Sequence, residues 1–416
     1  MKLFFFIGVV IITSTVVSQE IVTLQECYDL ASVNYPLTKQ LSLFETQHQL
    51  EQEVVLSSKL PQFSFDAQAT YQSDVIAVPI PNSTIKPINK DQYRATLSVN
   101  QLIYNGGATD ASLNVKSSQL KTKQKQVEVN LYQLKQHINQ LYFSILLAQE
   151  TDLLLQSKQT LLEVKLSEVI SGIKYGVLLP ASDKVLKVEL IKIKKQLKDI
   201  ESNKVTLIET LSSIIGHHLD PSTTFQNTLI ETITTTELTR PELELFQLKK
   251  DEIESNEAVI AKQNSPKLLG FATGGYGNPG LNMLDNSFQP FYSLSVKLNW
   301  NVFDWNSNKK LREALSINKD IIDTETETFK LNTNTELNQQ LNEIKRIEAF
   351  IASDLEIINL RKEVLKSADS QLKNGVITSS AYITELTNLY EDENTLIKHK
   401  IQLQLAKANY NVIKGH

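Results

Sequence analysis

Residues 113–145 read LNVKSSQLKTKQKQVEVNLYQLKQHINQLYFSI and contain neither glycine nor proline. A seven-residue apolar repeat places one stripe along an α-helix and is typical of coiled-coil packing. The stretch therefore predicts a long helix that packs against other helices along one seam. The repeated positions are Leu113, Leu120, Val127, Leu134 and Leu141.

The shortage of helix-breaking residues extends over most of the chain. The 416 residues include only 13 Gly and 11 Pro. Globular proteins average about 7% Gly and 5% Pro, so a loop-rich sandwich or a many-turned α/β enzyme is disfavoured. The block 108–171, which lacks both residues, would span roughly 96 Å as one helix. A second heptad series predicts another long helix, at Leu337, Ile344, Ile351, Ile358, Leu365 and Leu372.

Composition and charge exclude several classes of protein. The net charge of −5 disfavours a nucleic-acid binder, which needs a basic surface. The single Cys27 excludes a disulfide framework and a cysteine metal cluster. The mean hydropathy of −0.20 excludes a protein built from membrane-spanning helices. It leaves open a membrane barrel, in which apolar and polar residues alternate along each strand.

Residues 1–18 have the pattern of a signal peptide. Lys2 supplies the positive charge, an apolar stretch follows, and Val16-Val17-Ser18 forms a small-residue cleavage site. The apolar stretch is shorter than the roughly 20 residues that span a bilayer. The sequence therefore predicts an exported chain.

Three other segments alternate apolar and polar residues clearly, and a fourth, at 266–277, is Gly-rich and alternates poorly. In the first, Phe63, Phe65 and Ala67 are separated by single polar residues. A period of two over about ten residues predicts β-strands and fits either a membrane barrel or a soluble sheet with one packed face. The predicted strands cover about 61–73, 92–104, 266–277 and 291–303.

The two halves of the chain repeat each other. Pro36, Pro61 and Tyr71 correspond to Pro241, Pro266 and Tyr276, and at a slightly shorter offset Tyr93, Asn100 and Gly176 correspond to Tyr292, Asn299 and Gly375. Each half is predicted to contain a strand hairpin followed by a long helical hairpin. The first repeat covers 19–217, with helices at about 107–171 and 181–215, and the second covers 218–416, with helices at about 306–373 and 378–414.

Four strands cannot close a barrel, and an open sheet in lipid would leave unpaired backbone groups at a cost of several kcal/mol each. If the strands lie in a membrane, several chains must contribute to one barrel. One predicted face is polar and suits a water-filled lumen wider than that of an eight-stranded barrel, so a trimer is the smallest open solution. That face contains Gln62, Ser64, Asp66, Ser98, Asn100, Lys297 and Asn299.

The sequence resembles the TolC-like outer membrane efflux proteins over nearly the whole mature chain. The motifs that carry the resemblance are Val22-Thr23-Leu24-Gln25-Glu26-Cys27, Asn34-Tyr35-Pro36, Leu60-Pro61, Leu102-Ile103-Tyr104-Asn105-Gly106-Gly107, Arg240-Pro241-Glu242 and Val302-Phe303-Asp304-Trp305.

The resemblance implies a mainly α protein with β-strands, assembled as a homotrimer. It implies a twelve-stranded barrel in contact with outer-membrane lipid in a Gram-negative cell, continued by an α-helical coiled-coil barrel in the periplasm. It further implies a passive exit duct of a tripartite efflux or type I secretion system. Such a duct docks to a periplasmic adaptor protein and an inner-membrane pump of the RND or ABC type.

The two predicted helical turns are the candidate partner surface. Each contains a glycine that can end a helix in the left-handed conformation, followed by apolar residues. Pro180 fits the first turn of the next helix. In the family these turns meet the adaptor, which assigns the contact to Gly176, Val177, Leu178, Gly375, Val376 and Ile377.

A periplasmic gate is less clearly marked. Relatives narrow this end with acidic side chains six and nine positions after the second-turn glycine, where this chain has Ala381 and Thr384. The nearest acids, Asp183 and Glu385, are the candidate gate residues, and both are equally explained as exposed helix charges.

No pattern of catalytic, cofactor-binding or metal-ligating residues emerges, so the chain is predicted not to be an enzyme. The six histidines form no His-Glu-x-x-His motif, and Gly274–Gly277 lacks the Lys-Ser/Thr of a phosphate loop. Two alternatives to a duct remain: a structural coiled-coil protein of the envelope, and a periplasmic adaptor without a pore.

Overall fold

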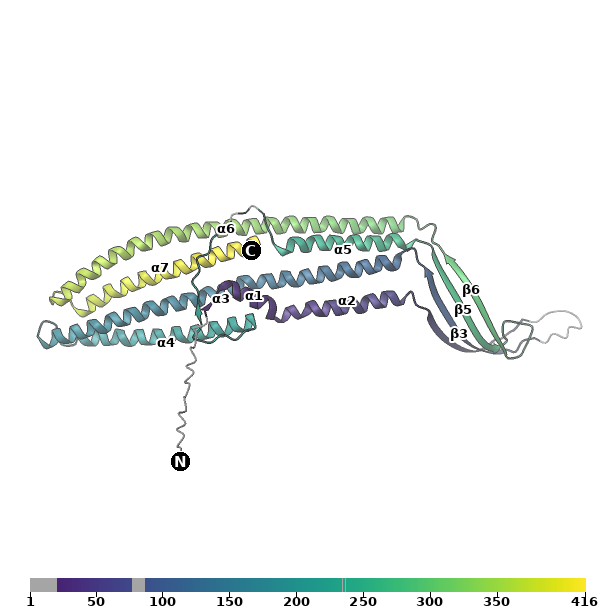
Figure 1. The fold of residues 1–416 in the computed structure, drawn as a ribbon, viewed down its shortest axis with the longest axis horizontal. Coiled ribbons are helices and arrows are strands. Elements are labelled where there is room, and N and C mark those ends of the chain that lie inside the picture. Colours follow the sequence, from purple (N-terminus) through teal and green to yellow (C-terminus); the bar gives the residue numbers. More distant parts are fainter. Residues whose placement is uncertain (1–20, 77–86, 234, 236) are drawn as a thin grey trace, which may run out of the picture. The chain divides into compact units, whose positions relative to one another are not determined.

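The computed structural model describes residues 21–76, 87–233, 235 and 237–416 (Figure 1). The predicted signal peptide, residues 1–18, lies outside the described residues. The fold is mainly helical with an antiparallel sheet, which confirms the predicted class. The chain divides into two compact units. The helical unit comprises the described part of Met1–Thr38, Leu131–Arg240 and Asn332–His416, and the sheet unit comprises Lys39–Asn130 and Pro241–Leu331.

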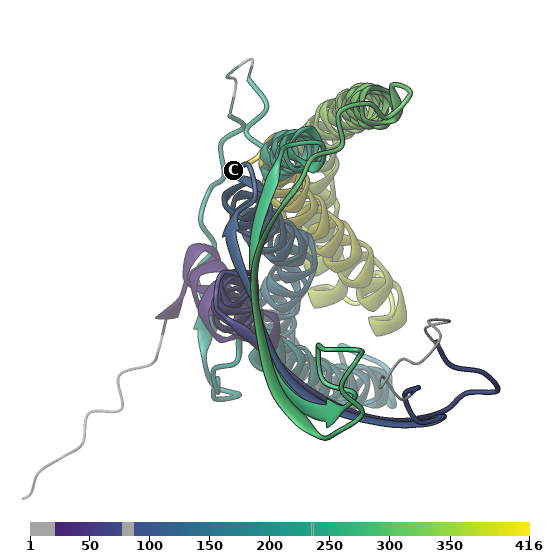
Figure 2. The ribbon, with the colours of Figure 1, turned by 90° about the vertical axis from the view of Figure 1, so that its right-hand side faces the viewer.

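The sheet unit contains one four-stranded antiparallel sheet in the order β2-β3-β5-β6. Figure 2 shows the strands curving together as one layer. Strands β2 and β6 lie at the edges, and within the described residues no strand pairs with their outer sides. The strand bounds are Gln62–Tyr71 for β2, Asp91–Tyr104 for β3, Lys267–Asn278 for β5 and Gln289–Asn299 for β6.

The strand register separates the two faces of the sheet by polarity. Residues directly opposite each other in antiparallel strands share a face. Phe65 lies opposite Leu97, whereas the next residue, Asp66, lies opposite Thr96. The same order continues across β5 and β6, where Ala272 pairs with Leu294 and Thr273 with Ser293. One face is therefore largely apolar, and the other, here called the polar face, is largely hydrophilic. The large apolar side chains exposed on the first face are Phe63, Phe65, Tyr71, Tyr93, Leu97, Tyr276, Tyr292, Leu294, Val296 and Leu298.

The glycines of β5 permit close contacts on the sheet. A Cβ atom at Gly275 would lie 2.5 Å from Cζ of Phe291 and 2.8 Å from the carbonyl oxygen of Ala95. A Cβ atom at Gly277 would lie 2.7 Å from the carbonyl oxygen of Tyr93. All three distances are shorter than a real Cβ atom allows, so a residue larger than glycine would require its neighbours to move.

Four helical segments complete the sheet unit: α2 (Lys39–Ser57), α5 (Pro241–Gln263) and the first parts of α3 (Ala108–Lys174) and α6 (Ser307–Lys373). Ion pairs and ring contacts join them. Lys116 lies 3.0 Å from Glu51 of α2, and Lys125 lies 2.5 Å from Glu244 of α5. The rings of Phe246 and Phe329 meet edge to face with centroids 5.8 Å apart.

The helical unit contains α1 (Leu24–Asn34), α4 (Ser182–Ile215), α7 (Ser379–Lys414) and the second parts of α3 and α6. It also contains the short 3-10 helix η1 (Pro36–Thr38) and a parallel pair of short strands, β1 (Ile21–Val22) and β4 (Thr224–Phe225).

The α3 seam forms the core of the helical unit. The seven-residue register that begins at Leu113 leads to Leu141, Leu155, Leu162 and Val169, all of which are buried. In α6 every residue of the second series is buried or partly buried. The buried ones are Leu337, Ile344, Ile358 and Leu372. Heptad packing therefore accounts for both long helices.

Asn139 is a polar exception within this core, and its side chain is fully buried. It accepts a hydrogen bond from the hydroxyl of Tyr28 in α1 and donates one of 2.9 Å to Asn409 in α7. A buried polar side chain is costly unless it is paired, so these bonds favour one register of α3 against its neighbours.

Cys27 is also fully buried, and burial raises the pKa of its thiol to about 12.

The helix termini are well defined. Thr23 forms a capping box with Glu26 at the start of α1. Gly216 ends α4 in the left-handed conformation with φ of 63°, and His217 and His218 follow outside the helix. In the described part of the chain, no helix combines the length and apolar character that a bilayer crossing requires.

The α3 seam can be tested by a matched pair of variants. Leu162→Ala removes a fully buried side chain, whereas its neighbour Leu161 is 42% exposed. We expect Leu162→Ala to lower the free energy of unfolding by about 2–5 kcal/mol and Leu161→Ala by clearly less. Urea unfolding followed by helical circular dichroism measures both. Equal losses would contradict the seam.

Candidate functional site

The turn between α3 and α4 ends in a compact glycine motif. Gly176 has φ of 76°, and the amide of Val177 donates a hydrogen bond of 2.9 Å to the carbonyl of Gly172. The amide of Leu178 donates to the same carbonyl at 3.2 Å. These bonds satisfy carbonyl groups that the end of a helix otherwise leaves unpaired. The glycine therefore allows α3 to end and reverse direction.

The turn between α6 and α7 has the same construction. Gly375 has φ of 67°, and the amide of Val376 donates a hydrogen bond of 2.9 Å to the carbonyl of Gln371. Thr378 caps α7 by accepting a hydrogen bond from the amide of Ala381. A Cβ atom at Gly375 would lie 2.7 Å from the carbonyl oxygen of Val177. The structure therefore brings the two predicted turns into direct contact.

The six predicted contact residues do not all face outward. Val177 is 52% exposed and Val376 is 71% exposed. Leu178 and Ile377 instead pack against the buried cluster at the end of the helical unit. The surface that the two turns offer consists of Val177 and Val376, together with the exposed Tyr175 and Leu179, which sequence reasoning missed.

The expected place of Pro180 is wrong. The sequence places it in the first turn of α4, but the helix begins at Ser182 and its N-cap residue is Ala181, with φ of 80°. Pro180 therefore lies before the cap. In the same turn the Leu178 side chain covers Gly172, where a Cβ atom would lie 2.8 Å from Cδ1 of Leu178.

Buried lysines of α3 connect the helices behind the turns. The Lys165 side chain is 7% exposed and forms ion pairs with Glu168 and with Asp369 of α6. Its ammonium also lies 5.5 Å from the ring centre of Tyr382 in α7. Burial by itself would raise the pKa of the Asp369 carboxyl, but hydrogen bonds from Lys165 and Lys373 outweigh it, and the pKa lies below its ordinary value. Lys165 thus links both helical hairpins.

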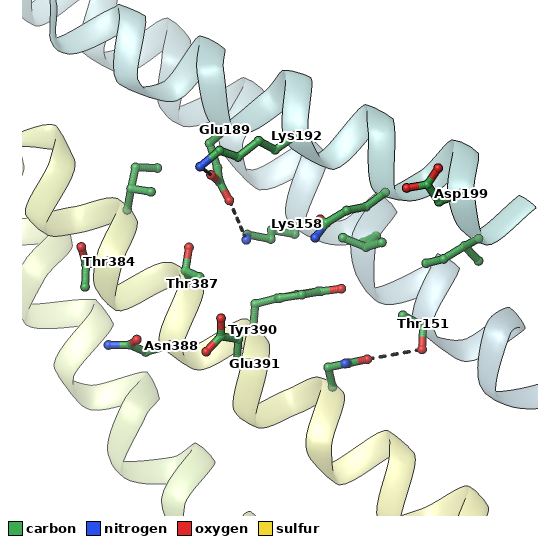
Figure 3. A pocket seen from close by; sticks show the side chains of 15 residues that line it. Thr151, Lys158, Glu189, Lys192, Asp199, Thr384, Thr387, Asn388, Tyr390 and Glu391 are labelled. Carbon is green, nitrogen blue, oxygen red and sulfur yellow. Dashed lines mark hydrogen bonds and ion pairs between the residues drawn. The ribbon is translucent and has the colours of Figure 1, made fainter.

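A groove of about 740 Å³ lies next to this link, between α3, α4 and α7 (Figure 3). Lys158 crosses it, with its ammonium 3.1 Å from Glu189 of α4 and 4.5 Å from the ring centre of Tyr390 in α7. Burial raises the pKa of the Tyr390 hydroxyl to about 12. Sequence analysis did not identify this groove. The available signal was the seven-residue spacing of Lys158 and Lys165 beside the seam.

The two candidate gate residues occupy separate ion-pair clusters. Asp183 lies 2.8 Å from Lys187 and 3.4 Å from Lys184, and the hydrogen bond from Lys187 keeps the pKa of its carboxyl below the ordinary value. Glu385 lies 3.5 Å from Arg361, which also pairs with Asp392 at 3.0 Å. A gate role for either acid stays a prediction.

Metal ligation has no support among the residues that the structure describes, where no group of three or more His, Cys, Asp and Glu side chains is arranged to hold an ion.

The link between Lys165 and Asp369 should depend on pH. A carboxyl whose pKa is lowered by folding stabilises the fold above its unfolded pKa of about 3.9, and this contribution is lost as the pH falls through the lower, folded pKa. We expect Asp369→Asn to destabilise the chain near neutral pH. The difference from wild type should shrink as the pH falls below the unfolded pKa and disappear once the pH lies below the folded pKa as well. Urea midpoints measured across this range test it, and a pH-independent difference would contradict the ion pair.

Comparison of the sequence with known proteins finds no relative. No protein-family profile matches the chain. No curated protein matches it either.

Comparison of the fold finds several solved structures. The channel CmeC of Campylobacter jejuni is 15% identical with a TM-score of 0.64, and the alignment covers 94% of this chain and 85% of CmeC. The outer membrane protein VceC of Vibrio cholerae is 13% identical with a TM-score of 0.65, covering 94% and 97%. The channel MtrE of Neisseria gonorrhoeae, solved in its open state, is 14% identical with a TM-score of 0.64, covering 94% and 89%. The chain therefore has the fold of the outer membrane channel proteins.

Proposed function

We propose that the chain is one subunit of a homotrimeric outer-membrane exit channel. The observation that carries the proposal is the sheet, which exposes an apolar face and a polar face. Among the described residues its two edge strands, β2 and β6, are each paired on one side only. A soluble protein would have to protect both the edges and the apolar face. Pairing β2 of one copy with β6 of the next would protect both edges. Lipid then covers the apolar face, and water fills the space inside.

Three copies would supply twelve strands and thereby a lumen that side chains do not fill. The sheet also argues against the two alternatives, because neither a coiled-coil rod nor an adaptor requires an exposed apolar sheet with open edges. The equal lengths of α3 and α6, 67 residues each, support an origin of the chain by duplication. The solved structures of similar fold are described as outer membrane channels.

The channel would be passive and work in a tripartite system. The candidate docking surface for a periplasmic adaptor is the pair of turns, where Val177 and Val376 are exposed although both are apolar. An inner-membrane pump of the RND or ABC type would supply the energy. The same proposal includes a boundary between the two repeats at residues 217 and 218, and cleavage of residues 1–18 as a signal peptide.

If the sheet lies in a membrane, a lysine should have opposite effects at two adjacent residues of β6. Leu294 is on the apolar face and is 76% exposed, whereas Ser293 is on the polar face. A lysine at mid-membrane on the lipid face of a barrel costs about 2–4 kcal/mol. We expect Leu294→Lys to reduce the heat-sensitive trimer in the outer-membrane fraction, and Ser293→Lys to leave it intact.

Unheated gel electrophoresis and planar-bilayer conductance measure the result. Wild type and Ser293→Lys should conduct as trimers. A soluble, non-conducting periplasmic monomer in the wild type would overturn the proposal, and equal tolerance of both lysines would overturn the assignment of the faces.

The docking surface predicts loss of efflux without loss of the trimer. Gly375→Asp should abolish efflux, but a side chain there also collides with Val177, so Val376→Asp is the cleaner variant. We expect Val376→Asp to reduce efflux strongly in cells that contain the adaptor and pump, because it places a charge in an apolar contact. Val376→Thr is the control. Cross-linking to the adaptor provides a second readout, and undiminished efflux and cross-linking would refute the surface.

A further inference from the structure

The polar face of the sheet carries an excess of positive charge. On this face the strands place three basic residues, Arg94, Lys267 and Lys297, and one acidic residue, Asp66. The other strand acid, Asp91, lies opposite Tyr71 in the register of the apolar face. Within the described residues none of the three bases forms an ion pair. Their charges are therefore available to solutes on this face.

Arg94 is held in a defined position on the polar face. It lies in β3, directly opposite Gly277 of β5, and Phe291 of β6 lies opposite Gly275. Because β5 has no side chain at either glycine, Arg94 reaches across this strand. Its guanidinium carbon lies 5.5 Å from the centre of the Phe291 ring.

The glycines make this contact possible. A side chain at Gly275 would occupy the space of the Phe291 ring, since its Cβ atom would lie 2.5 Å from Cζ. A cation above an aromatic ring is attracted by the electron-rich face of the ring. The contact keeps the guanidinium near the sheet, and within the described residues its hydrogen-bond donors have no carboxylate partner. The glycines of the segment Gly274-Gly275-Tyr276-Gly277 thereby make room for this contact.

We infer that this face makes the lumen prefer anions, with Arg94 as the principal determinant. The inference rests on the proposed function, because only a closed barrel turns the polar face into a lumen wall. In a trimer each charge occurs once per subunit, so Arg94 would form a ring of like charges in a confined space. Rings of arginine or lysine attract anions and repel cations. Asp66, opposite Thr96 on the same face, partly offsets the ring.

Ion selectivity in planar bilayers tests the inference. With a potassium chloride gradient, the reversal potential of the wild-type trimer should show preference for chloride. Arg94→Glu should shift it towards potassium and reverse its sign, whereas Asp66→Asn should shift it further towards chloride. Arg94→Lys keeps the charge and should keep the sign. Phe291→Leu keeps every charge and should produce only a small shift.

The outcomes separate this inference from the proposed function. A wild-type protein without conductance would overturn the channel itself. Conducting trimers that prefer potassium, or whose reversal potential is unchanged in Arg94→Glu, would overturn this inference and leave the channel in place. The unheated gel shows whether each variant still forms the trimer, and Arg94→Gln provides a milder replacement if Arg94→Glu does not assemble.

Discussion

Heptad packing along α3 is the interaction on which the rest of the structure depends. The seam residues Leu141, Leu155 and Leu162 place α3 against the other helices of the helical unit. The buried Asn139 and Lys165 add polar bonds that are satisfied in one register only, since a shift of α3 would leave both unpaired. The position of the turn at Gly176 follows from that register.

The sheet unit follows a different rule, because its residues alternate with a period of two. Side chains on the apolar face are about as exposed as those on the polar face, and in the described part of the chain no strand pairs with the outer sides of β2 and β6. A single chain therefore leaves both sheet edges and the apolar face exposed. The same feature supports the proposed assembly into a barrel, in which Arg94, Lys267 and Lys297 would face the lumen.

Several elements were predictable from local patterns. The alternation that starts at Phe63 predicted β2, and the absence of Gly and Pro over 108–171 predicted α3. The glycines at 176 and 375 marked both turns. Tyr175 and Leu179 were missed as exposed residues, and Pro180, expected in the first turn of α4, lies before its N-cap residue Ala181. Heptad spacing alone does not reveal that Lys158 is buried beside Tyr390.

The sequence by itself determined which segments are helices, strands and turns, because these depend on periodicity and on the conformational limits of Gly and Pro. Only the tertiary structure decided which side chains meet. It brought Val177 against Gly375, joined Lys165 to Asp369, and laid Arg94 over Phe291 across the glycines of β5. The physical reason is that contacts between residues distant in sequence depend on strand order and helix register, which local periodicity does not encode.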